Sequence, residues 1–392
     1  MAGPLAAIKV IEMAHMISGP YAGMLLADQG AEVIKVELPG SGDYFRKWQT
    51  YGGQITPSFA CYNRGKKSVT INTKSKSGCE IYRRLTSNAD VLIENFRPGT
   101  LERYGIGYDD LKKHNSKLVY CSISGMGSSG PYRDLPSYDQ MVQGMSGLWS
   151  QLTDMEKPEP VGPPICDQLT GLYALYGILG ALVGRLLTGK GQKLEVSMLG
   201  SGIAFAPAAI AQYFAEGIVA DKSSKSITSQ SYAFVASDGK PFGVHLSTPP
   251  KFWEAFTTVA GCPEFIEDKR FKTKADRIKN YYLLHDLLQE QFKKKPRHEW
   301  LALMMENDVP AGALNDIAEA VSDPQAQHLG MVREFGDGER VMKLVGFPVI
   351  YQDTACAPGL PPPFIGEHNR EVYKGLGYTD EDLLRFRKEE AI

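Results

Sequence analysis

Short apolar runs alternate with amphipathic stretches through the first half of the chain. Each run is about six or seven residues long, which is typical of buried strands. The runs cover residues 8–13, 31–37, 66–72, 89–95 and 118–123. Helical spacing recurs between them, over residues 21–29, 76–87 and 108–114. Because parallel strands are joined by right-handed helical crossovers, this alternation predicts a large Rossmann-like α/β domain with a parallel sheet.

The second half has a different pattern and predicts a smaller α+β domain. Residues 231–246 alternate like a hairpin with a turn at 237–240, and residues 250–328 are mostly helical. The predicted organisation is a large domain (1–196), a linker (197–222), a small domain (223–326), a second linker (327–345) and a segment that returns to the large domain (346–392). Residues 40–59 and 216–229 are predicted to lack regular structure, as a loop and a linker.

One apolar helix is predicted from Leu172 to Arg185, and Asp167 lies just before it. The apolar run is only about fifteen residues long, shorter than a membrane span, so we expect a buried helix. On spacing alone, Asp167 is typical of a helix N-cap, whose side chain accepts a backbone N–H. Gly171 costs about 1 kcal/mol against alanine inside a helix, which indicates either close packing against the sheet or room for a ligand.

The composition and charge of the chain argue against several classes of function. The 392-residue chain is 43% hydrophobic and 22% charged, with a net charge of -2, so there is no overall electrostatic case for nucleic acid or membrane. Its 6 cysteines show no C-x-x-C spacing, which argues against zinc and suits a reducing cytoplasm. The turn after the first strand is not G-x-G-x-x-G, so a nicotinamide cofactor is not indicated. The first residues also lack the pattern of a signal peptide.

Several short motifs occur in a fixed order along the chain. They are Gly19-Pro20, Gly40-Ser41-Gly42-Asp43, Asn63-Arg64-Gly65-Lys66, Pro98-Gly99, Asp167-Gln168-Leu169-Thr170-Gly171, Gly189-Lys190-Gly191-Gln192, Pro310-Ala311-Gly312 and Gly366-Glu367-His368. With them the chain resembles, end to end, the family III coenzyme A transferases, the group that contains formyl-CoA transferase and the carnitine CoA-transferases. The resemblance implies an interlocked, ring-like homodimer that uses acyl-CoA and a small carboxylic acid as substrates and holds no permanent cofactor or metal.

The resemblance also implies which residues act. The family's catalytic aspartate falls on Asp167, a carboxylate that would attack a thioester and form a mixed anhydride, then an aspartyl-CoA thioester. At a helix N-terminus we expect its pKa to be low. The implied CoA contacts are Ile17, Ser18, Ile71, Lys74, Asn95, Phe96, Arg97, Arg103 and Tyr138. The implied acyl-pocket residues are Trp48, Asp139, Gln230 and His245.

Some positions depart from the family pattern or keep two interpretations. An arginine that meets the CoA nucleotide in formyl-CoA transferase aligns with Leu38 here. The backbone N–H groups of Ile17 and Ser18 are candidates for stabilising an oxyanion. His15 is either a general base or a structural histidine. Asp139 lies where the family has a glutamate, and as one of two nearby carboxylates it is a candidate to donate a hydrogen bond.

The sequence leaves three functions to compare: a CoA-transferase, an acyl-CoA racemase and a non-catalytic CoA-binding protein. The related α-methylacyl-CoA racemases have a histidine at the position of Tyr138, and a tyrosine with a pKa of about 10 is a poor base, which favours a transferase. A non-catalytic CoA-binding protein is the third interpretation, and the intact Asp167 speaks against it. The glycine run of formyl-CoA transferase is replaced by residues 226–231, which contain no glycine. We therefore expect a larger acceptor acid than oxalate, with succinyl-CoA or another acyl-CoA as donor.

Overall fold

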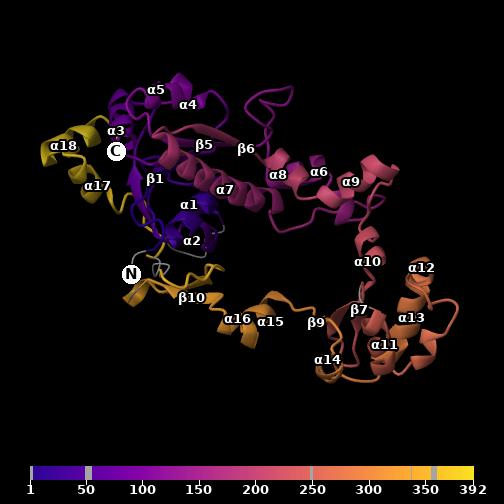
Figure 1. Cartoon of the computed structure of the whole chain (residues 1–392). Coiled ribbons are helices and arrows are strands. Elements are labelled where there is room, and N and C mark those ends of the chain that lie inside the picture. Colours follow the sequence, from indigo (N-terminus) through magenta and orange to yellow (C-terminus); the bar gives the residue numbers. More distant parts are fainter. Residues whose placement is uncertain (1–2, 49–54, 248–249, 337, 355–359) are drawn as a thin grey trace. The chain divides into compact units, whose positions relative to one another are not determined.

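The computed structural model describes residues 3–48, 55–247, 250–336, 338–354 and 360–392. The chain forms two compact units (Figure 1). The first comprises residues 1–149, 160–207 and 328–392, and the second comprises residues 150–159 and 208–327. Each unit has its own hydrophobic core.

The first unit is built on a six-stranded parallel sheet. Its strands are β1 (Lys9–Met13), β2 (Glu32–Glu37), β3 (Lys66–Thr70), β4 (Val91–Glu94), β5 (Val119–Ser124) and β6 (Lys193–Ser197). Their order is β3-β2-β1-β4-β5-β6, which is that of a doubly wound Rossmann sheet. The predicted strands and their parallel pairing are confirmed.

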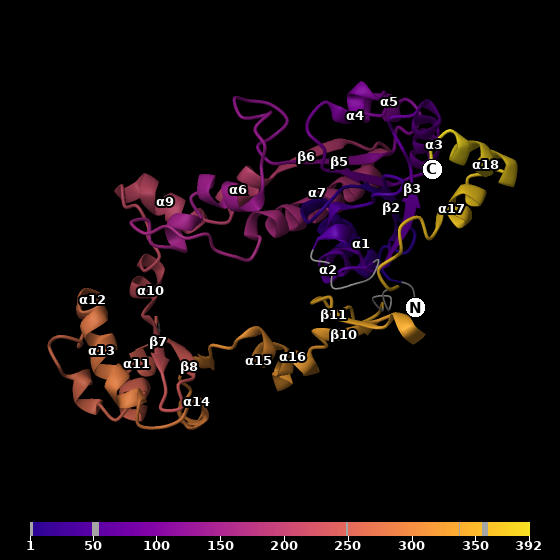
Figure 2. The same cartoon turned by 180° about the vertical axis from the view of Figure 1, so that it is seen from behind.

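Helices cover both faces of this sheet (Figure 2). Those with residues in the two core clusters are α1 (Ser18–Asp28), α3 (Lys76–Thr86), α4 (Thr100–Arg103), α5 (Tyr108–Lys112), α7 (Ile165–Thr188), α17 (Asn369–Gly375) and α18 (Asp380–Lys388). The unit also contains α2 (Pro57–Asn63), α6 (Asp139–Met145) and α8 (Met198–Ala204). A small hairpin of β10 (Val332–Phe335) and β11 (Met342–Val345) belongs to the same unit.

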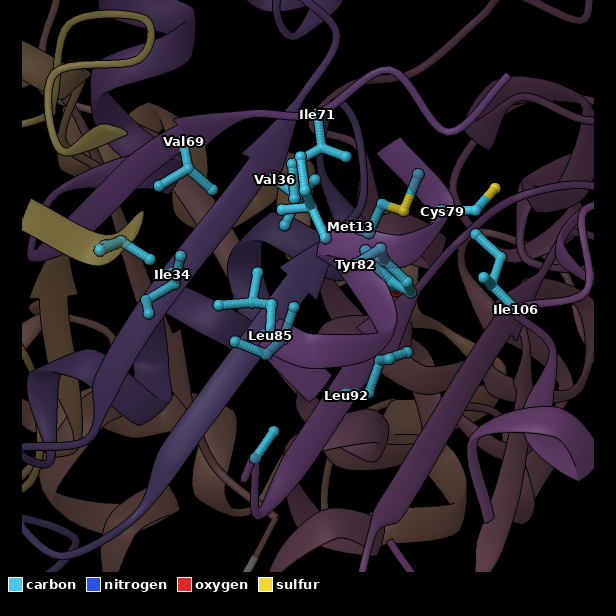
Figure 3. Packing of buried hydrophobic residues seen from close by; sticks show 14 of the residues in the cluster. Met13, Ile34, Val36, Val69, Ile71, Cys79, Tyr82, Leu85, Leu92 and Ile106 are labelled. Atoms are coloured by element: carbon cyan, nitrogen blue, oxygen red, sulfur yellow. The ribbon is translucent and has the colours of Figure 1, made fainter. Parts of the chain in front are cut away.

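Alternate residues of each strand pack on opposite faces of the sheet, as the period of two requires. Val10 packs in a cluster with α1 and α7, whereas its neighbour Ile11 packs with α3, α17 and α18. Figure 3 shows the second cluster, where Tyr82 and Leu85 of α3 lie against strand residues such as Ile34. The two helical layers thereby fix the strand ends that carry the site described below.

The second unit combines a three-stranded antiparallel sheet with helices. It contains α9 (Pro207–Glu216, whose first residue belongs to the first unit), α10 (Ser224–Ser229), β7 (Ser231–Val235), β8 (Pro241–His245), α11 (Pro250–Val259), α12 (Lys274–Lys279), α13 (Tyr281–Phe292), α14 (Arg297–Glu306), β9 (Ala311–Ala313), α15 (Ile317–Ser322) and α16 (Pro324–His328, whose last residue belongs to the first unit). The predicted hairpin is confirmed as β7–β8.

Three sequence predictions are wrong. Residues 57–63 form helix α2 rather than loop, because Thr56 caps the helix and Pro57 starts it. Residues 224–229 form the short helix α10 within the predicted linker. Helix α7 is 24 residues long rather than about fifteen, and only 33% of its most apolar window is buried, so it is not a fully buried helix. Judged only by its length and composition, α7 is long and apolar enough to cross a membrane.

Candidate active site

A pocket of about 380 Å³ lies in the first unit, within the size range of ligand sites. Its walls are the segments that follow β1, β4 and β5, with the loop 133–138, Asp167 of α7 and Met198 of α8. The strand order reverses between β1 and β4, and ligands of open α/β sheets bind at such switch points beyond the carboxyl ends of the strands. The six predicted site residues that line it are Ser18, Asn95, Phe96, Arg97, Tyr138 and Asp167.

Asp167 lies in the first turn of α7 and is half-buried. Pro164 occupies the N-cap position and the helix has no side-chain cap, so the predicted capping role of Asp167 is wrong. Its carboxylate instead receives hydrogen bonds from the hydroxyl and the backbone N–H of Ser18, the first residue of α1. The carboxylate is therefore held between the starts of two helices.

Asp139, in the first turn of α6, is the second carboxylate of the site. Its Oδ1 accepts the backbone N–H of Asp167 at 3.0 Å, and its Oδ2 accepts from the Gln143 side chain. Both oxygens of Asp139 thus accept hydrogen bonds, and the hydrogen bond that the sequence suggested it would donate stays a prediction. Its side chain is buried, at 6% exposure, so its charge is felt by Asp167 through protein rather than water.

The pKa of Asp167 is raised to about 7, first by burial and then by the charge of Asp139. The two hydrogen bonds from Ser18 oppose this rise because they stabilise the anion. The expected low pKa is therefore wrong, since burial outweighs the helix N-terminus. About half of the carboxyls are ionised at neutral pH, and a less stabilised carboxylate is a more basic nucleophile.

Gly171 allows α7 to approach α1. A Cβ atom at this position would lie 2.9 Å from the Ser18 carbonyl oxygen and 2.9 Å from the Tyr21 ring. The packing interpretation of this glycine is confirmed, although its partner is a helix rather than the sheet. Close contact of the two helices brings Ser18 to Asp167.

His15 lies in the pocket wall between Tyr44 and Phe96, with ring centroids 5.5 and 5.4 Å away. Burial and then the Lys35 charge lower its pKa, so the ring is neutral at pH 7. Its Nδ1 is buried without a hydrogen-bond partner among the described residues. Asn95 binds the His15 backbone through both groups of its side-chain amide, each at 2.9 Å.

Basic side chains gather at one end of the pocket. Arg97 and Arg133 line it, and a Cβ on Gly99 would lie 3.4 Å from an Arg133 nitrogen and 4.0 Å from an Arg103 nitrogen. Three guanidinium groups near one pocket suit a ligand with several phosphates. Sequence reasoning missed Arg133, whose only signal was a basic residue in the loop before Tyr138.

The other predicted contacts lie outside this pocket. Ile71 is 1% exposed in the core, and its backbone N–H donates to the Glu37 carbonyl at 2.8 Å. Lys74 is an exposed residue, and Trp48 is 51% exposed beside residues 49–54, which the structure does not describe. Ile17 precedes α1 as its N-cap. These residues stay predictions.

Gln230 and His245 belong to the second unit. Gln230 is fully buried, and its Oε1 accepts from Arg277 at 3.1 Å. His245 lines a separate pocket of about 630 Å³ and contacts the hydroxyls of Ser231 and Ser247 at 2.7 and 2.8 Å. Their predicted acyl-pocket role remains a prediction.

Comparison with known proteins assigns the chain to a family. The model of CoA-transferase family III matches residues 5–369. The chain belongs to CoA-transferase family III. This membership makes it a CoA-transferase, an enzyme whose substrates are CoA thioesters, and confirms the resemblance seen in the sequence.

Relatives of this family match the chain along nearly its whole length. It is 34% identical to the succinate–glutarate CoA-transferase of Agrobacterium fabrum, over 95% of this chain and 96% of that protein. It is 35% identical to the acetyl-CoA:oxalate CoA-transferase of Acetobacter aceti, over 92% of each. The crystal structure of a CAIB/BAIF family protein from Brucella suis superposes with a TM-score of 0.85 at 33% identity, covering 96% of this chain and 100% of that one.

Proposed function

We propose that this CoA-transferase works by covalent catalysis on Asp167. The supporting observation is the position of this carboxylate in the pocket at the switch point of the sheet, where Ser18 donates to it. In the first step the Asp167 carboxylate attacks the thioester carbonyl of the donor, which gives a mixed anhydride and free CoA thiolate. The thiolate then attacks the aspartyl carbonyl, which releases the donor acid and leaves an aspartyl-CoA thioester.

The second half of the cycle reverses these steps with another acid. The acceptor carboxylate attacks the aspartyl thioester and displaces CoA, which forms a new mixed anhydride. CoA thiolate then attacks the acceptor's acyl carbon, so that the new acyl-CoA leaves and the Asp167 carboxylate is regenerated. Each oxyanion develops near the start of α1, where the N–H groups of Ile17 and Ser18 are the proposed donors.

Binding of CoA is proposed to use the basic end of the pocket. Arg97, Arg103 and Arg133 lie close enough together to share the phosphates, and Arg133 supplies positive charge that Leu38 lacks. Asn95 and Phe96 would contact the CoA through their position at the end of β4. Lys74 and Ile71 remain proposed contacts at the end of β3.

The proposed substrates are succinyl-CoA as donor and a dicarboxylic acid larger than oxalate as acceptor. The name of the Agrobacterium relative, a succinate–glutarate CoA-transferase, supports this pair. The absence of glycine from residues 226–231 supports it as well. Trp48, Asp139, Gln230 and His245 are the proposed acyl-pocket residues.

A homodimer is proposed from the outer face of α7. Tyr176, Leu186 and Leu187 are 78, 82 and 83% exposed on this helix, and Leu172 and Val183 are exposed as well. An apolar row of this length on a single chain is typical of a surface covered by another subunit.

The proposed location of the protein is cytoplasmic.

Mass spectrometry of the intact protein tests the covalent step. The protein is mixed with succinyl-CoA, trapped with hydroxylamine, and compared with Asp167→Ala. An adduct that maps to Asp167 in the wild type and is absent from the variant is expected. Without an adduct from any of several donors, the mechanism is wrong, and wash-in of deuterium at the α-carbon of an acyl-CoA would then indicate a racemase. Tyr138, which lines the pocket, argues against a racemase because a tyrosine is a poor base at neutral pH.

A further inference from the structure

The turn between β1 and α1 carries Ser18 to the nucleophile, and its shape depends on a residue outside the pocket. We propose that Asp43 is a positioning residue, whose buried carboxylate holds the backbone of Met16 so that Ser18 meets the Asp167 carboxylate. The consequence for catalysis rests on the proposed function of Asp167. Asp43 itself is fully buried and does not line the pocket, so it acts through Met16.

Met16 has a backbone conformation that its side chain disfavours. Its φ is 65°, in the left-handed region that residues other than glycine rarely adopt. Such a conformation persists only where the surrounding structure enforces it. Here the Met16 N–H points at the Asp43 carboxylate, at 3.2 Å from Oδ1 and 3.3 Å from Oδ2.

Asp43 is in turn fixed from three directions. Its Oδ2 lies 2.9 Å from Lys35 Nζ, its Oδ1 accepts the Phe45 N–H at 2.9 Å, and its own N–H donates to Glu37 at 2.9 Å. A carboxylate held by an ammonium and a backbone N–H, on a residue whose own N–H is also bound, has little freedom to move. It can therefore impose a position on the turn that it binds.

Lys35 links Asp43 to the start of the same turn. Its ammonium is fully buried and contacts Glu12 at 2.8 Å, Asp43 at 2.9 Å and the Ala14 carbonyl at 2.9 Å. Burial alone would lower the pKa of Lys35, but the charges of Asp43 and Glu12 outweigh burial and raise it, so the ammonium stays charged. Lys66 completes the cluster, at 2.6 Å from the second oxygen of Glu12.

The turn is thus held at three successive residues before it reaches Ser18. Lys35 holds Ala14, Asn95 holds His15 by two hydrogen bonds, and Asp43 holds Met16. Of these three contacts, the one at Met16 is nearest to Ser18 and the one that supports the strained backbone. Loss of Asp43 would release Met16 and misalign the Ser18 donors.

The test compares two identical substitutions of buried carboxylates. Asp43→Asn removes the charge that faces Lys35 and turns an amide toward the ammonium. Asp28→Asn, at the other end of α1, likewise breaks a buried ion pair, since Asp28 contacts Arg64 at 2.6 Å. The control therefore reports what loss of a buried pair in this unit does by itself.

Two readouts are measured on full-length protein. Infrared difference spectra against Asp167→Asn give the pKa of the Asp167 carboxyl, and trapped adduct with succinyl-CoA at pH 8 gives the acylation rate. Asp43→Asn is expected to raise the Asp167 pKa by about one pH unit, because charged hydrogen bonds from Ser18 are lost. It is expected to slow acylation about 10- to 100-fold, and Asp28→Asn to do neither.

His15 lines the same pocket and loses the Asp43 charge that raises its pKa, so its ring stays neutral in Asp43→Asn. Other groups facing Asp167 are unchanged in both variants. They are the Asp139 carboxylate of α6, the Tyr62 hydroxyl of α2 and the neighbouring Cys166 thiol. A change of the Asp167 pKa confined to Asp43→Asn is therefore assigned to the turn. Equal pKa values in the two folded variants would overturn the proposal.

Two further outcomes, an absent adduct and a variant that does not fold, also have a defined meaning. If wild-type protein forms no adduct, the proposed function fails, while the infrared pKa still tests the role of Asp43. If Asp43→Asn does not fold, amide hydrogen exchange of the wild type replaces it. The Met16 and Ser18 amides are then expected to exchange as slowly as the β1 amides, and fast exchange at Met16 would show that Asp43 does not hold the turn.

Discussion

Asp139→Asn should make the nucleophile work at lower pH. Burial and the Asp139 charge together raise the Asp167 pKa from its ordinary value of 3.8 to about 7. The substitution removes the charge but keeps an oxygen that can accept the Asp167 N–H, now 3.0 Å from Asp139. The pKa of Asp167 should therefore fall part of the way, since burial is the larger cause and remains.

The size of the effect follows from the ionised fraction. With a pKa of about 7, about 1% of Asp167 is ionised at pH 5. A fall of about one pH unit, equivalent to about 1.4 kcal/mol, raises that fraction about tenfold. Acylation at pH 5 should then be faster in the variant, by somewhat less than about tenfold because its carboxylate is less basic, whereas at pH 9 both proteins are ionised and the variant should be the slower one.

The assay is the rate of adduct formation with succinyl-CoA, measured by quenched flow and intact mass from pH 5 to 9. Asp134→Asn is the matched control, because Asp134 lines the same pocket but is not among the causes of the raised pKa. Its pH profile should match the wild type. An unchanged or higher pKa in Asp139→Asn would show that the two carboxylates do not repel each other as the structure indicates.

Three further predictions concern stability and assembly. The folded-state pKa of Asp167 is raised, so wild-type protein loses stability as pH rises from about 4 to 7 and the carboxyl ionises. The free energy of unfolding in urea should therefore be higher for Asp167→Asn than for wild type at pH 8, by at most about 4 kcal/mol. Below pH 4 the two proteins should be equally stable. Gly171→Ala should destabilise by about 1–2 kcal/mol through contact with Ser18 and Tyr21, while Gly184→Ala, whose nearest neighbour is 3.8 Å away, should not; equal melting temperatures would contradict this. Leu187→Glu on α7 should yield monomers in sedimentation equilibrium, whereas Leu384→Glu, at another exposed leucine on α18, should leave the dimer intact. A dimeric Leu187→Glu would show that α7 is not the interface.

Much of the first unit was predictable because its signals are local. Each strand is a short apolar run, and the parallel arrangement follows from the helices between the runs. Asp167 could be found only because the motif around it matches a family, since an aspartate before a helix is ordinarily a cap. Its raised pKa was missed because burial arises from the packing of α6 and α1 around it, which no spacing in the sequence encodes.

The turn at Met16 was likewise beyond sequence reasoning. Lys35 and Glu12 occur in strand-like runs, where the sequence gives no sign that both are fully buried and paired. The motif that contains Asp43 resembles the family, but the sequence predicts only a loop for it. A left-handed methionine cannot be recognised from residue type, because the type that favours this conformation is glycine.

The helices α17 and α18 have a consequence for how the protein is made. Val372, Tyr373 and Phe386 lie in the same core cluster as Ile34 and Tyr82, so one face of the parallel sheet is completed by residues that are synthesised long after β6. At ribosomal rates of about 5–20 residues per second, roughly 10 to 40 s pass between β6 and these helices. During that interval the nascent sheet lacks the helices that bury this face, so its apolar side chains are more exposed than in the finished fold.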